Sequence, residues 1–160
     1  MLLKLIGVGI IASGAWVLGR SVSEGYKDKI KIIDSYIAFI KNFKSVVLFS
    51  GTNMYVFFSK NQDNNTKKFL NFLIDRKCNS AIFEFKGANK IEDKCISLIS
   101  ESIILAEKTS DRELISDFLE ECAYKLTCFK KEIMEEYRGK IKTAPSVGLM
   151  FGIFIAVLIV

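Results

Sequence analysis

A long run without charged side chains lies at each end of the chain, and this constrains the fold more than any other feature. The first apolar run, LIGVGIIASGAWVLG, covers residues 5–19, and the second closes the sequence at residues 147–160. All 18 acidic residues and all but one of the 23 basic residues lie between Arg20 and Lys142. A soluble protein has no reason to place its apolar residues this way, so lipid is the simplest solvent for both ends.

The lengths of the two runs suit membrane helices at the short end of the usual range. At the rise of an α-helix, residues 1–19 would span about 28 Å and residues 144–160 about 26 Å, against a hydrocarbon core of roughly 30 Å. Modest thinning of the bilayer covers the difference at a small energetic cost. The sequence therefore predicts transmembrane helices at 1–19 and 144–160, on either side of one charged domain at 20–143.

Each run has an alternative interpretation. A signal peptide also begins with an apolar stretch, and SGA at 13–15 could serve as its cleavage site. That site lies inside the apolar run, however, and the basic residues from Arg20 onward follow as in a stop-transfer anchor. The second run is short enough for a buried core helix, but it is apolar around its whole circumference. We therefore expect both runs in lipid.

Basic residues next to the two spans predict the orientation. They follow the first span and precede the second, so both spans place the charged middle in the cytoplasm under the positive-inside rule. Trp16, near the inner end of the first span, fits an interfacial anchor. The residues expected at the membrane surface, where anionic headgroups attract them, are Arg20, Lys27, Lys29, Lys31, Arg138, Lys140 and Lys142.

Small residues stand four apart within the spans, so each pair lies on one helix face and lets another backbone approach closely. These pairs predict helix packing in the membrane, although small residues are also common in membrane helices generally. The residues concerned are Gly9 and Ser13, Ala15 and Gly19, and Gly148 and Gly152.

The charged middle has helical spacing throughout, and Pro145 is the one proline in the chain. Apolar residues recur at steps of three and four from residue 26 to 47, which predicts a long helix leaving the first span. Further helices are expected at 52–60, 66–78, 79–85, 91–105 and 110–137. The last is predicted to begin with Ser110 as its N-cap and Glu113 completing a capping box, with an apolar line through Leu114, Phe118 and Cys122. We therefore expect an all-α fold with six helices packed as a bundle.

The residues that usually carry enzyme chemistry are scarce. The chain has no histidine, the commonest metal ligand and the usual proton shuttle near neutral pH. The four cysteines form no CxxC pair and are expected to be reduced, buried side chains. Acidic pairs such as Glu92 and Asp93 are flanked by lysines and predict solvated helix faces. No catalytic residue, metal site or cofactor is indicated, although an enzyme is not excluded.

The net charge of +5 raises the question of nucleic-acid binding. The basic excess, however, gathers beside the two predicted spans. Anionic lipid headgroups account for that clustering, so a nucleic-acid partner is not expected.

One acidic stripe opens the last predicted helix. Five carboxylates face a single opposing charge, that of Arg112, and most of them fall at steps of three and four on one helix face. An ordinary solvated face is one interpretation, and a surface that steers a basic partner is the other. The five residues are Asp111, Glu113, Asp117, Glu120 and Glu121.

Three segments together resemble the stage III sporulation protein AB family of endospore-forming bacteria. They are the opening MLLKLIGVGIIASGAWVLG, the helix start TSDRELISDFLEECAYKL and the closing RGKIKTAPSVGLMFGIFIAVLIV. The likeness extends over the whole chain in length and layout. Where the family is expected to carry Leu-Gly before the Ser-Asp pair, this chain has Lys108 and Thr109.

The resemblance implies a component of the transenvelope complex between mother cell and forespore. Members are similar to a cytoplasmic domain of the inner-membrane platform protein of type II secretion and type IV pilus systems. The resemblance further implies a location in the mother-cell membrane, where the protein would couple a secretion-type ATPase, stage III sporulation protein AA, to ring-forming membrane proteins. No reaction of its own is implied.

Two other classes of function stay open. A membrane-bound enzyme or ligand sensor would need a polar pocket with converging carboxylates. A small structural membrane protein, holin-like or stress-related, would be expressed in growing cells, so the timing of expression separates it from a sporulation protein.

Overall fold

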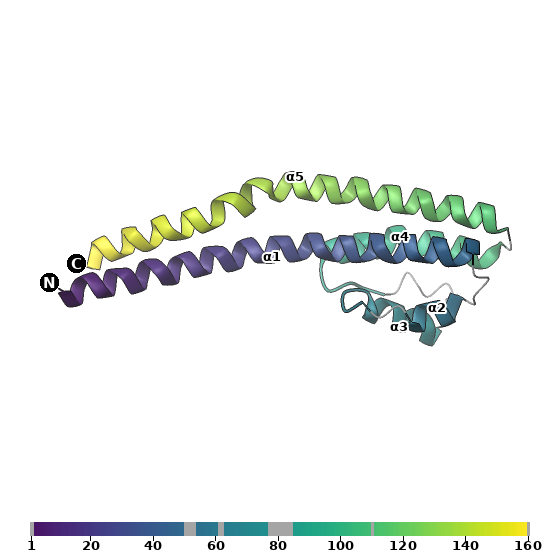
Figure 1. Cartoon of the computed structure of the whole chain (residues 1–160), viewed down its shortest axis with the longest axis horizontal. Coiled ribbons are helices and arrows are strands. Elements are labelled where there is room, and N and C mark those ends of the chain that lie inside the picture. The colour runs from purple at the N-terminus through teal and green to yellow at the C-terminus, as the bar shows by residue number, and fades with distance from the viewer. Residues whose placement is uncertain (1, 50–53, 61–62, 77–84, 110, 160) are drawn as a thin grey trace. The chain divides into compact units, whose positions relative to one another are not determined.

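The chain is all-α in the part that the computed structural model describes, residues 2–49, 54–60, 63–76, 85–109 and 111–159. These residues form five helices (Figure 1). The helices are α1 (Leu2–Phe49), α2 (Met54–Lys60), α3 (Lys67–Arg76), α4 (Lys90–Lys108) and α5 (Arg112–Ile159). The predicted all-α class is confirmed.

The number and packing of the predicted helices are only partly matched. The helices expected at 52–60, 66–78, 91–105 and 110–137 correspond to α2, α3, α4 and α5. The short helix expected at 79–85 falls almost wholly on residues 77–84, which lie outside the described residues. Each predicted span is continuous with its neighbouring helix, so that α1 and α5 are each 48 residues long.

Contacts between Cα atoms divide the chain into two compact units. Unit 1 comprises Met1–Ile30 and Glu132–Val160, and unit 2 comprises Lys31–Lys131. Helices α1 and α5 contribute to both units, whereas α2, α3 and α4 belong to unit 2 alone. The predicted boundaries of the membrane spans, which place a charged domain at 20–143, describe where the chain leaves the lipid. Contacts within the chain do not test them, so they stay predictions.

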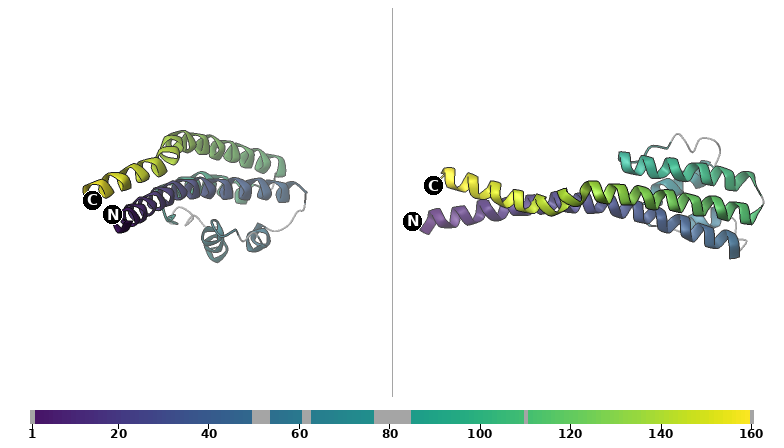
Figure 2. Two further views of the ribbon diagram at one scale, coloured as in Figure 1. Left: turned by 60° about the vertical axis from the view of Figure 1, so that its left-hand side comes forward. Right: turned by 90° about the horizontal axis from the view of Figure 1, so that it is seen from above.

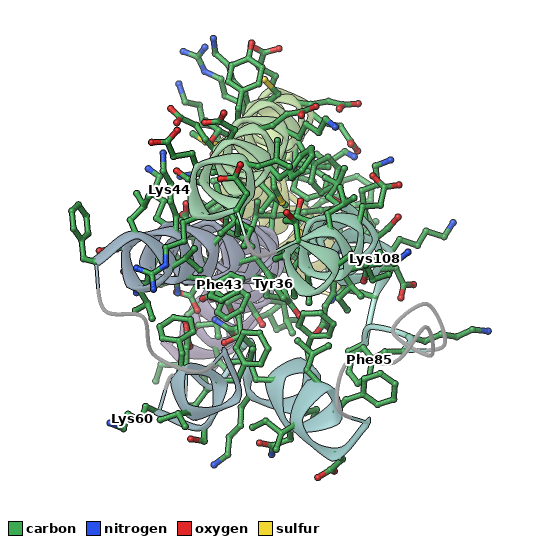
Figure 3. All side chains as sticks on the ribbon, turned by 90° about the vertical axis from the view of Figure 1, so that its right-hand side faces the viewer. Tyr36, Phe43, Lys44, Lys60, Phe85 and Lys108 are labelled. Atoms are coloured by element: carbon green, nitrogen blue, oxygen red, sulfur yellow. The ribbon has the colours of Figure 1, made fainter. Side chains whose placement is uncertain are left out.

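Unit 2 has a core of aromatic and aliphatic side chains. Phe39 and Phe43 of α1 pack against Phe57 and Phe58 of α2, with ring centroids 5.4–6.0 Å apart. Figure 3 shows Phe43 among the helices, while Lys60 and Lys108 point away from them. Burying a side chain of this size stabilises the fold by about 1.5–3 kcal/mol.

The buried line of α5 differs from the predicted one at its start. Leu114 is exposed and Phe118 half-buried, whereas Ile115 and Leu119 are buried. From Leu114 to Cys122 the predicted line advances four residues at each step, and at 3.6 residues per turn such a line drifts around the helix. The buried residues mix steps of four and three, which keeps one face toward the core. From Ile115 to Leu126 the buried apolar side chains are Ile115, Leu119, Cys122, Ala123 and Leu126, and Ile133 is buried two turns further on.

The start of α5 also differs from the prediction. The Asp111 carboxylate accepts backbone N–H bonds from Glu113 at 3.0 Å and from Leu114 at 3.3 Å, so Asp111 caps the helix. Ser110, the predicted cap, lies outside the described residues. Asp and Ser are nearly equally good N-caps, so the sequence alone did not decide whether Ser110 or Asp111 caps α5.

Candidate functional site

Within unit 1, the N-terminal part of α1 and the C-terminal part of α5 lie side by side and antiparallel (Figures 1 and 2). Glycines make the contact. A methyl group added at Gly148 would lie 2.5 Å from the carbonyl oxygen of Ala15, and one added at Gly19 would lie 2.5 Å from that of Ala144. One added at Gly152 would lie 2.6 Å from the Ala15 side chain. The two backbones are therefore closer than any larger residue would allow.

The small residues singled out in the sequence divide into two groups. Ala15, Gly19, Gly148 and Gly152 lie in this contact. A methyl group at Gly9 would meet nothing within 4 Å, and the Ser13 hydroxyl donates to the carbonyl of Ile10 on its own helix, at 3.0 Å. The same four-residue spacing therefore marks a helix contact in two pairs and not in the third.

The apolar side chains around this contact point outward. In each of α1 and α5, only 11% of an apolar stretch of 18 residues is buried. Both helices are long and apolar enough to cross a membrane, by length and composition. The large apolar side chains exposed on them include Ile10, Val17, Leu18, Met150, Phe154 and Leu158.

Pro145 lies inside α5 rather than at its boundary. A proline has no N–H, so the carbonyl four residues earlier, that of Ile141, loses its helical donor. The hydroxyl of Ser23 on α1 donates to this carbonyl at 3.0 Å, and Ser23 is only 4% exposed. The side chain of one helix thus replaces the hydrogen bond that proline removes from the other.

This replacement predicts strong coupling between Ser23 and Pro145. Ser23→Ala should destabilise the helix pair by about 1–3 kcal/mol, because it leaves a part-buried carbonyl without a donor. In a Pro145→Ala background the restored N–H occupies that carbonyl, so Ser23→Ala should cost almost nothing. The wild type, the two single variants and the double variant form a double-mutant cycle. Unfolding of each full chain in mixed detergent micelles measures its stability. Equal costs of Ser23→Ala in both backgrounds would contradict the replacement.

The seven basic residues expected at a membrane surface occupy different environments. The Nε of Arg20 forms an ion pair with the Glu24 carboxylate at 3.0 Å. The Cζ of Arg20 lies 5.6 Å from the centre of the Trp16 ring. Lys140 forms an ion pair with Glu136 at 3.1 Å, which raises the pKa of its ammonium group. Lys29 is half-buried, and Lys27, Lys31, Arg138 and Lys142 are exposed.

The acidic stripe is partly occupied by contacts within unit 2. Asp111 caps α5, Glu120 lies 2.6 Å from the ammonium of Lys44, and Glu121 lies 2.8 Å from that of Lys125. The Lys44 ammonium lowers the pKa of the Glu120 carboxyl. Two carboxylates, Glu113 and Asp117, are exposed and form no ion pair with a described residue.

Glu92 is buried, which corrects the prediction of a solvated acidic pair. It is 8% exposed, accepts a hydrogen bond from the Tyr36 hydroxyl at 3.2 Å, and accepts another from the backbone N–H of Ala88 at 2.7 Å. Asn89 caps the same helix by accepting from the backbone N–H groups of Ile91 and Glu92. Asn89 and Glu92 have the spacing of a capping box, the signal that could have identified this helix start.

The buried Glu92 carboxylate affects two neighbouring groups. Burial first, and the negative charge of Glu92 second, raise the pKa of the Tyr36 phenol above its ordinary range. The same two causes raise the pKa of the Cys95 thiol to about 12. Both groups therefore stay protonated at neutral pH, and the cluster acts as a structural link between α1 and the start of α4.

Three cysteines are described, and all are free thiols. Cys95 and Cys122 are buried, as predicted, whereas Cys128 is exposed on α5. Cys78 lies outside the described residues. Among the residues that the structure describes, no cluster of histidine, cysteine or acidic side chains could hold a metal ion.

No family model matches the chain, and neither a curated protein nor a solved structure does.

Proposed function

We propose that the chain is a non-enzymatic, membrane-anchored scaffold. The two apolar helices of unit 1 form its anchor, and unit 2 carries its partner surface. The observation that carries the proposal is the glycine contact of Gly148 with Ala15 and Gly19, surrounded by exposed apolar side chains.

The two parts of this observation suit lipid for different reasons. Lipid tails are as apolar as leucine, so helices in a membrane associate through close packing of small residues rather than by burying large ones. The large apolar side chains are then free to face the tails. In water the same exposed residues would form an unusually large apolar surface.

We further propose that this scaffold serves the sporulation complex between mother cell and forespore. The resemblance of the three sequence segments to the stage III sporulation protein AB family supports this assignment. In that role the protein lies in the mother-cell membrane with unit 2 in the cytoplasm, and it positions the secretion-type ATPase against ring-forming membrane proteins.

Thiol labelling tests the anchor and its orientation together. Cys128 is exposed in unit 2, so a membrane-impermeant maleimide should leave it unlabelled in intact cells and label it in inverted membrane vesicles. Cys95 and Cys122 are buried and should react only after denaturation. The protein should also remain in the membrane fraction after alkaline carbonate washing.

Two controls make this experiment decisive. An external cysteine must react in intact cells, and a cytoplasmic cysteine must not. Labelling of Cys128 in intact cells would reverse the orientation, and release of the protein by carbonate would remove the membrane anchor altogether.

We propose Glu113 and Asp117 as the acidic partner surface. Both are exposed on the first turns of α5, with the exposed apolar side chain of Leu114 beside them. The remaining acidic residues of the stripe already form a cap or an ion pair within unit 2. Complementary charge on a partner would mainly set the rate and register of docking.

Charge reversal tests this surface. Glu113→Lys with Asp117→Lys should reduce recovery of the ATPase from detergent-solubilised membranes several-fold, and more strongly at low salt. The matched control is Glu132→Lys with Glu135→Lys, which makes the same charge change on exposed residues of the same helix. Equal recovery with both pairs would exclude this surface.

The two other classes of function differ from a scaffold in observable ways. The aromatic and aliphatic packing of unit 2 around Tyr36, Phe39 and Phe43 favours a scaffold over an enzyme or sensor, which would need a polar pocket. A holin-like or stress-related protein would share the membrane anchor. Expression in growing cells would favour that class, and expression confined to sporulation would favour the scaffold.

A further inference from the structure

Two lysines converge on one pair of tyrosines in unit 1. The rings of Tyr26 on α1 and Tyr137 on α5 have centroids 4.7 Å apart and are tilted by 55°. The ammonium nitrogen of Lys29 lies 5.3 Å from the Tyr26 centroid and 5.7 Å from that of Tyr137. That of Lys140 lies 5.8 Å and 5.2 Å from the same two centroids. Two cations from different helices are therefore held beside the same rings.

The negative charge nearby is insufficient for both cations. Lys140 has an ion pair with Glu136, whereas Lys29 is half-buried and forms no ion pair with a described residue. An aromatic face attracts an ammonium group but leaves N–H donors of that group unused. The cluster thus combines two lysine side chains beside the same rings, N–H donors that the rings leave unused, and an excess of positive charge, which together attract an anion.

The position of the cluster in the sequence indicates which anion is close by. Tyr26 follows Gly19 by seven residues, and Tyr137 precedes Pro145 by eight. These intervals correspond to about 10–12 Å of helix beyond the apolar segments. Side chains on a helix lean toward its N-terminus, so Lys29 reaches back toward the apolar end of α1. Lys140, five residues before Pro145, leans the other way along α5 and meets Lys29 at the tyrosines. Tyrosine itself favours the headgroup layer of a bilayer.

We propose that Lys29 and Lys140 bind one phosphodiester group, that of an anionic phospholipid beside unit 1. This inference rests on the proposed membrane insertion of unit 1. It assigns a specific lipid site to two of the seven basic residues, and leaves the other five as a diffuse positive surface.

Lipid binding by the full chain in nanodiscs tests this site. The discs contain phosphatidylcholine with a minor share of phosphatidylglycerol, and native mass spectrometry measures the phosphatidylglycerol retained. Lys29→Gln and Lys140→Gln should each weaken retention about fivefold, because a well-placed lysine contributes about that factor at a lipid surface. Lys27→Gln and Lys142→Gln are the matched controls: they remove the same charge from exposed positions on the same helices, away from the tyrosine rings, and should weaken retention less than twofold.

Each other outcome overturns the site. An equal loss in all four variants would reduce it to general surface charge, and no loss in any of them would remove lipid binding there. Inorganic phosphate is tested in discs of phosphatidylcholine alone. Phosphate binding that depends on Lys29 and Lys140 as strongly as lipid retention does would assign the site to a soluble anion instead of a lipid. Carbonate resistance of the same variants separates a failure of this inference from a failure of membrane insertion.

Discussion

Replacing Gly148 by leucine should force the two apolar helices of unit 1 apart. Even the first carbon of the new side chain would lie 2.5 Å from the carbonyl oxygen of Ala15 and 3.1 Å from the Cα of Gly19. These are backbone atoms, which cannot turn aside as a flexible side chain can, so the helices themselves must move. We expect the distance between the helix axes to increase by about 2 Å, toward the range of helices that pack through larger residues.

Spin labels can measure this separation. Ile10 and Phe154 are exposed, so labels there report the distance between α1 and α5 by double electron–electron resonance, in a chain whose native cysteines are replaced by alanine. Gly14→Leu is the matched control, since a methyl group at Gly14 meets nothing within 4 Å. The labels must first be shown to detect a change of this size. If Gly148→Leu then leaves the distance unchanged, α1 and α5 do not pack closely at Gly148.

Replacing Phe39 by alanine should have the largest effect on unit 2. Phe39 is 2% exposed, and its ring contacts those of Phe43, Phe57 and Phe58. Removing it leaves a cavity between α1 and α2 and should destabilise unit 2 by about 3–5 kcal/mol. Urea denaturation of the detergent-purified chain, followed by loss of helical circular dichroism, measures the change.

Phe49 provides the control for this substitution. It lies on the same helix and is 84% exposed, so Phe49→Ala should change the stability by no more than about 0.5 kcal/mol. Similar losses for both phenylalanines would mean that Phe39 is not a core residue. A change in the slope of the unfolding free energy against urea concentration would indicate an altered denatured state rather than a lost contact.

The helices of this chain could be predicted well from its sequence because their signals are local. Helical spacing of the apolar residues predicted the elements now seen as α2, α3, α4 and α5. The exact residue at which a helix begins could not be predicted where two adjacent residues suit the same role. The Ser110–Asp111 pair is such a case, because either residue is a good N-cap.

Contacts between distant segments were not predictable in the same way. Gly9 and Gly148 each belong to a small-residue pair with the same spacing, yet only Gly148 faces the partner helix. The difference depends on the rotation of both helices about their axes, which spacing within one helix does not fix. The lysines that flank Glu92 in the sequence predict a solvated residue, yet Glu92 is buried. Its burial depends on Tyr36, which is 56 residues away.

The hydrogen bond from Ser23 to the carbonyl of Ile141 has a consequence for how the chain can evolve. A proline at 145 creates the need for a donor, and a hydroxyl at 23 meets it, although the two positions are far apart in the sequence. Threonine could take the place of serine, whereas alanine or valine at 23 would be tolerated only once the proline had been lost. Descendants of this chain should therefore change at both positions together, and a homologue without the proline should be free to carry any small residue at 23.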